Sequence, residues 1–121
     1  MDAETDLFVQ AFWVKCREII RPALDDAQGK LRDAGHDANI STLEFSPDRE
    51  TSPDGAPALV LTVHPSGKPA ASVVRYRGDV PAREVEISLP GERPMRADMS
   101  TIDDAMVRNH ITRAFGGLLK S

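Results

Sequence analysis

The sequence predicts an α+β fold in which two amphipathic helices, one near each end of the chain, cover one face of a four-stranded antiparallel sheet. Three observations predict this fold. Apolar residues recur with helical spacing near both ends, four segments of alternating polarity lie between them, and short connections rich in Pro and Gly join these segments. A chain of 121 residues has room for one hydrophobic core, so residues 1–121 are expected to form a single domain.

The first helix is expected over residues 7–34, with Thr5 or Asp6 as its cap. At 100° per residue, one broad arc of this segment is apolar and should face the core; its members are Phe8, Phe12, Cys16, Ile19, Ala23, Ala27 and Leu31. Pro22 lies on the opposite, polar side, where a proline bends a helix but leaves its buried face continuous. We therefore predict one kinked helix, and two helices that separate at Arg21 are the alternative.

The four strands are expected at residues 41–46, 58–64, 71–77 and 83–89. Their short connections favour an antiparallel meander, because parallel neighbours would need long crossovers. In the hairpin of the second and third strands, Leu61 is expected opposite Val74 and Leu59 opposite Tyr76. This register places all four side chains on one apolar face.

The register of the last two strands follows from their apolar and charged positions. Placing Tyr76 opposite Val85 keeps the apolar residues on the inner face, and it predicts two ion pairs on the outer face, Arg77–Glu84 and Arg75–Glu86. The outer face is then expected to consist of Thr42, Glu44, Val60, Thr62, His64, Val73, Arg75, Arg77, Glu84, Glu86 and Ser88. We interpret it as a solvated face; a polar interaction surface centred on Val60 and Val73 is the alternative.

The last helix is expected over residues 101–118, with Ser100 as its cap. Its apolar stripe consists of Val107, Ile111, Ala114, Phe115 and Leu118. The segment 90–99 before it contains prolines and is expected to be an irregular loop.

Composition argues against several classes of protein. The 15 basic and 19 acidic side chains give a net charge of −4, which does not attract nucleic acid or anionic membranes. No apolar run approaches the ~20 residues that span a bilayer, and the acidic N-terminus does not resemble a signal peptide. A single cysteine is consistent with a reducing compartment, so we expect a cytoplasmic protein. The abundance of Ala, Arg, Asp and Pro is typical of proteins from GC-rich bacteria.

No catalytic group, metal site or cofactor is predicted. His36, His64 and His110 have no second ligand at a metal-binding spacing, and the sequence contains no phosphate-binding or nucleophile motif. Cys16 falls in the middle of the apolar arc, where burial raises the pKa of a thiol and a small hydrophobic role is expected.

The first helix carries more apolar surface than one sheet requires. Leu7, Ala11 and Val14 lie on the side opposite Phe12, so the first two turns are apolar nearly all round. Either the C-terminal helix covers these residues, or they form a homodimer interface together with Trp13. We accordingly expect a non-enzymatic interaction domain, an adaptor or a chaperone-like partner of another protein, that forms a homodimer.

The alternative function is the binding of a small anionic molecule, or a modest enzymatic activity on one, in a pocket between the helices and the sheet or under the loop of residues 90–99. Arg93, Arg96, His64 and Tyr76 are its candidate polar contacts. Nucleic-acid binding is not expected, because each arginine of the outer face is predicted to pair with a glutamate and stacking aromatics are missing from that face.

Overall fold

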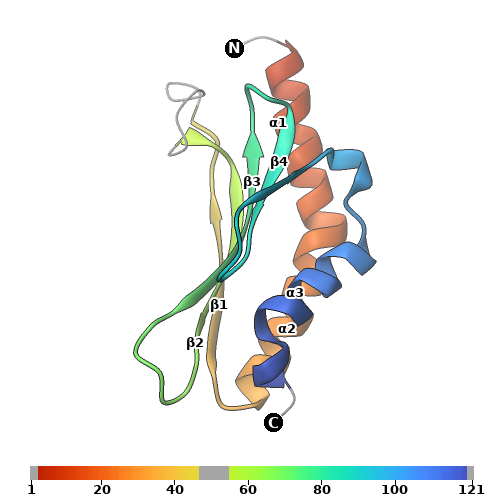
Figure 1. Ribbon diagram of the computed structural model, residues 1–121. Helices are drawn as coiled ribbons and strands as arrows, with labels where there is room; N and C mark the ends of the chain where they lie inside the picture. Colours follow the sequence, from red (N-terminus) through yellow and green to blue (C-terminus); the bar gives the residue numbers. More distant parts are fainter. Residues whose placement is uncertain (1–2, 47–54, 120–121) are drawn as a thin grey trace.

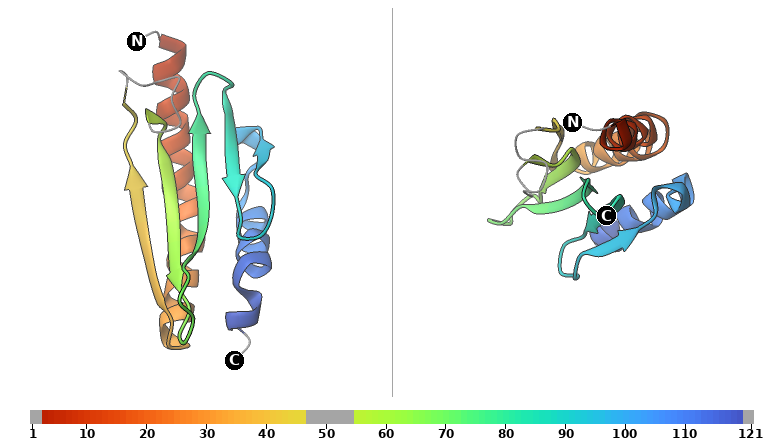
Figure 2. Two further views of the ribbon diagram at one scale, coloured as in Figure 1. Left: turned by 60° about the vertical axis from the view of Figure 1, so that its left-hand side comes forward. Right: turned by 90° about the horizontal axis from the view of Figure 1, so that it is seen from above.

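The computed structural model describes residues 3–46 and 55–119 and confirms the α+β class (Figure 1). The elements, in chain order, are α1 (Ala3–Lys15), η1 (Cys16–Ile20), α2 (Arg21–Asp33), β1 (Asp37–Leu43), β2 (Ala58–His64), β3 (Ser72–Asp79), β4 (Glu84–Ser88), β5 (Met95–Ala97), η4 (Met99–Thr101) and α3 (Asp104–Leu119). The helices lie on one face of the sheet (Figure 2). Between the two layers lies one core, in which the apolar side of the sheet meets residues such as Phe12, Leu24 and Phe115.

The segments α1, η1 and α2 follow one another without a break, which confirms a helix that continues past Pro22. The element η1 is a π-helical turn, in which the N–H of Arg21 donates to the carbonyl of Cys16 five residues earlier. Proline has no N–H to donate, and its ring crowds the preceding turn of an ordinary helix. A widened turn directly before Pro22 accommodates both effects, so the helix need not end at Arg21.

The sheet is an antiparallel meander in the order β1-β2-β3-β4-β5, so the predicted four strands are joined by a fifth. The prediction of an irregular loop over 90–99 missed β5, which has only three residues. The first strand also begins at Asp37, four residues before the predicted start. Thr42 of β1 pairs with Leu59, whose side chain faces the helices, so the prediction that Thr42 lies on the outer face was wrong. Its neighbour Leu43 lies on the outer face instead.

The register of the second hairpin is as predicted, with Leu61 opposite Val74 and Leu59 opposite Tyr76. The predicted register of the β3–β4 hairpin is wrong by two residues, because Tyr76 lies opposite Ile87 and Val85 lies opposite Gly78. The cause is the length of β3, which continues through Gly78 to Asp79. A shift of two residues leaves every side chain on its predicted face, because side chains alternate with a period of two.

The last helix begins later than predicted, at Asp104. The carboxylate of Asp103 accepts the N–H of Met106 (2.8 Å), so this residue and not Ser100 caps α3. Ser100 lies instead in the short turn η4, where its N–H donates to the Asp98 side chain. The predicted apolar stripe faces the core, and α3 packs mainly against α2 and η1. This packing leaves much of the side of α1 that faces away from the sheet uncovered.

Candidate functional site

An uncovered apolar surface lies on α1. Leu7 is 64% exposed and Val14 is 41% exposed, and Ala11 is exposed between them on the same side of the helix. We call these three residues the α1 strip. The C-terminal helix does not bury them, contrary to the first of the two alternatives for this surface. These neighbouring apolar side chains make this side of the helix a candidate contact surface.

The α1 strip continues into an open groove of about 620 Å³. One wall consists of Ala11, Val14 and Ile19, and the other is the connection between β5 and α3, including Met99. Lys15 joins the two walls, because its ammonium group donates to the carbonyl of Ile102 (3.0 Å). The groove therefore extends the surface beyond the helix itself, and Glu18 and Asp98 lie among its lining residues.

Trp13, the fourth predicted interface residue, lies apart from the α1 strip. It is half-buried, and its ring meets the ring of Phe12 edge to face, with centroids 5.2 Å apart. It lines a separate pocket beside Thr42 and Leu59, at the β1 side of the sheet. The structure thus brings together three of the four residues and places the fourth on another surface.

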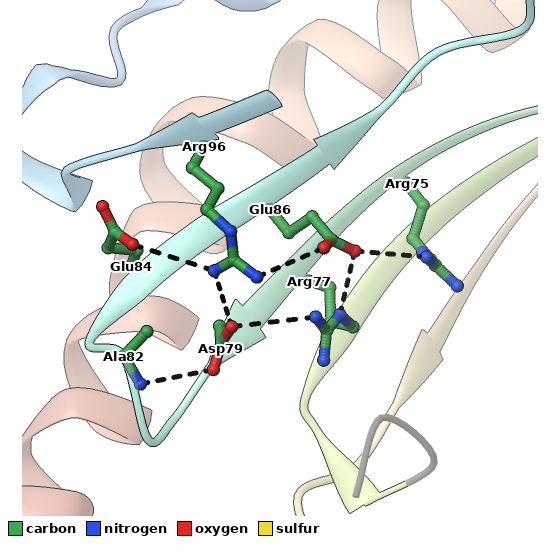
Figure 3. Close-up of polar contacts among 7 residues, drawn as sticks. All are labelled: Arg75, Arg77, Asp79, Ala82, Glu84, Glu86 and Arg96. Atoms are coloured by element: carbon green, nitrogen blue, oxygen red, sulfur yellow. Dashed lines mark hydrogen bonds and ion pairs between the residues drawn. The ribbon is translucent and has the colours of Figure 1, made fainter. Parts of the chain in front are cut away.

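A network of charges covers part of the outer sheet face (Figure 3). Glu86 is at its centre and pairs with Arg77 (3.2 Å), Arg75 (3.5 Å) and Arg96 (3.6 Å). The predicted Arg75–Glu86 pair is confirmed. The predicted Arg77–Glu84 pair is wrong, because the shifted register places Glu86 opposite Arg77.

The remaining contacts of the network involve Asp79 and the last strand. Arg96 of β5 pairs with Asp79 (2.6 Å) and Glu84 (3.7 Å), and Asp79 also accepts the N–H of Ala82 (3.3 Å). Burial tends to raise the pKa of Asp79, but the hydrogen bonds from Arg96 and Ala82 and the charges of Arg96 and Arg77 together lower it below its usual value. Three arginines thus face three carboxylates, and the cluster is neutral.

The four candidate ligand-binding residues do not converge. Tyr76 is fully buried on the inner face, whereas Arg96 lies on the outer face and is bonded to carboxylates. His64 is exposed at the end of β2, and Arg93 is exposed between β4 and β5. Side chains on opposite faces of a sheet cannot line one pocket in a single chain.

Tyr76 and His110 form a polar pair inside the core that the sequence analysis did not foresee. The Tyr76 hydroxyl lies 2.9 Å from Nδ1 of His110, and both side chains are buried. Burial raises the pKa of Tyr76 above its usual value. Burial and the nearby charge of Arg113 lower the pKa of His110, against an opposing effect of Glu92. The signal available in the sequence was the position of His110, three residues after Val107 and one before Ile111 on the apolar stripe.

This pair predicts a loss of stability in mild acid. Well above its usual pKa of about 6.5, histidine is neutral in both the folded and the unfolded chain. As the pH falls through that value, the unfolded chain binds a proton first, because folding lowers the pKa of His110. The free energy of unfolding is therefore expected to fall between about pH 7.5 and pH 5, and urea titrations of the protein and of His110→Gln would measure it. An equal decrease in both proteins would assign the effect to other groups.

Cys16 has the buried position expected from the sequence. It is 3% exposed, and burial raises the pKa of its thiol to about 12. Within residues 3–46 and 55–119, no three His, Cys, Asp or Glu side chains are grouped to hold a metal ion. In the same part of the chain, no helix combines the length and the apolar character needed to cross a membrane.

Comparison with known proteins identified no relative of this chain. The chain matches no family model, no curated protein and no solved structure with which it was compared.

Proposed function

We propose that this protein is a non-enzymatic interaction domain, an adaptor or a chaperone-like partner of another protein, that acts as a homodimer joined through the α1 strip. The observation that supports the proposal is the exposure of Leu7 and Val14 on one side of α1, beside an apolar groove. Burying these side chains against a second copy would remove apolar surface from water, which is the main favourable term in association.

The surface available to a second copy is larger than the α1 strip alone. A stable interface buries about 800 Å² on each partner, more than three side chains supply. The groove adds Ile19 and Met99 to the α1 strip and widens the contact beyond one helix. An isologous contact uses this combined surface twice, once from each copy.

The mass of the protein in solution tests this proposal. Light scattering over a series of concentrations is expected to give twice the chain mass of 13.2 kDa at high micromolar concentration. Dilution should lower the mass toward that of one chain, since association depends on concentration. A mass of one chain throughout the series would refute the homodimer.

A further inference from the structure

The first strand, β1, is an edge strand of the sheet. It pairs with β2 on one side, and no other described strand lies on its second side (Figure 2). An edge strand presents unpaired backbone N–H and C=O groups, and an extended peptide can pair with them as an additional strand. Whether β1 is available for such pairing depends on what covers its free side.

Side chains of α2 cover only the beginning of this edge. Gln28 and Arg32 both donate to the carbonyl of Ala38 at 3.0 Å, so the backbone of Ala38 faces away from β2. In an antiparallel ladder, both backbone groups of a residue point to the same side and successive residues alternate. The N–H and C=O groups of Ile40 and Thr42 therefore also face away from β2, and they lie beyond Ala38, whose carbonyl Gln28 and Arg32 cover.

A small pocket lies directly beside Thr42. It has a volume of about 250 Å³, and the side chains that line it with Thr42 are Trp13, Cys16, Leu59, Arg17 and Arg21. An incoming strand would direct every second side chain toward this pocket, because side chains alternate between the two faces of a sheet. The pocket is apolar enough to receive an aliphatic side chain of that strand.

Two arginines add positive charge at the pocket. The side chains of Arg17 and Arg21 are 73% and 46% exposed, and each pairs only loosely with a carboxylate of the same helical segment, Glu18 at 3.7 Å and Asp25 at 3.6 Å. Exposed pairs of this kind contribute little and can exchange partners. Carboxylates on an incoming strand would meet these guanidinium groups.

We propose that β1 binds an extended acidic segment of a partner protein as a sixth strand, with an aliphatic side chain in the Trp13–Leu59 pocket and carboxylates at Arg17 and Arg21. The proposal rests on the role of the protein as an interaction domain but uses a surface separate from the α1 strip. A second copy of β1 fits less well, because its helix-facing residues are Ala38, Ile40 and Thr42, none of which is acidic.

The probe is a dye-labelled peptide, Thr-Glu-Thr-Val-Thr-Glu-Thr with blocked ends. Its central Val and the two Glu residues share one face. Saturable binding by fluorescence anisotropy is expected, together with slower amide hydrogen exchange at Ile40 and Thr42. A control peptide with Lys in place of Glu should bind at least about tenfold more weakly, which corresponds to about 1.4 kcal/mol. No saturable binding, or equal binding of the two peptides, would overturn the proposal.

Variants of the protein locate the site. Arg17→Glu combined with Arg21→Glu should lower the affinity at least about tenfold, whereas Lys68→Glu, an exposed lysine between β2 and β3, should leave it unchanged. Thr42→Pro removes an outward N–H without breaking a bond to β2, and it should abolish binding. If both arginine substitutions leave the affinity unchanged, the site is not at β1.

The two proposals can fail separately. A monomeric protein that still binds the peptide would support the β1 site and refute only the dimer. Protection of the Ile40 and Thr42 amides that rises with protein concentration, without peptide, would instead assign this edge to a second copy and overturn the peptide proposal.

Discussion

Leu7→Asp and Val14→Asp are each expected to convert the dimer into a folded monomer. Leu7 is 64% exposed and Val14 41% exposed in one chain, so aspartate should cost little stability there. In the dimer, the same carboxylate would be buried without a partner, which costs several kcal/mol. Sedimentation velocity should show a loss of the dimer at concentrations where the unsubstituted protein is fully associated, and circular dichroism should show an unchanged fold.

The matched control is Val73→Asp. Val73 is 40% exposed, almost the same as Val14, but it lies on β3 on the outer face of the sheet. Its substitution is expected to leave the mass unchanged. A monomer produced by Val73→Asp, and a dimer retained in Val14→Asp, would move the interface to the outer face around Val60 and Val73 and contradict the assignment to α1.

Gly78→Ala is expected to lower the free energy of unfolding by about 1–3 kcal/mol, because the helix layer lies directly on this residue. A Cβ atom at Gly78 would lie 3.1 Å from Cγ of Pro57 and 3.3 Å from the ring of Phe12. Neither neighbour can move easily. Phe12 is fully buried in the core, and Pro57 is buried and accepts the Gly78 N–H through its carbonyl (2.8 Å). Urea denaturation would measure the change.

Gly29→Ala provides the comparison with opposite sign. Gly29 is exposed within α2, and a Cβ atom added there meets nothing within 4 Å. Alanine is the better helix former, so this substitution should stabilise the protein by about 0.5–1 kcal/mol. A neutral or stabilising effect of Gly78→Ala would show that α1 is not held against β3 at this point.

The class of fold and the faces of the strands could be predicted because both depend on periodicity. The apolar arc of the first helix and the alternation in β2, β3 and β4 each repeat several times, so an error at one end does not change the face. This explains why Tyr76 was placed on the correct side although its partner was wrong by two residues. The polar pair with His110 required knowledge of how α3 lies over the sheet, which periodicity does not contain.

The failures occurred where a local pattern was too short or was decided by tertiary contacts. The fifth strand has three residues and is formed by pairing with β4, so 90–99 alone contains little signal for it. Without that strand, Arg96 was interpreted as a loop residue that could contact an anionic ligand, whereas it closes the charge network around Asp79. Trp13 was assigned to the dimer interface with its neighbours, but the helix turns it toward β1.

A spin label on α1 shows whether two copies contact each other through this helix. Gln10→Cys places a nitroxide on an exposed position beside the α1 strip, and the buried Cys16 should not react. Dipolar spectroscopy is expected to show one short, well-defined distance between labels on two chains, and Val14→Asp should abolish it. A label at Gln10 that senses no second spin, at concentrations where the mass is that of a dimer, would contradict the contact through α1.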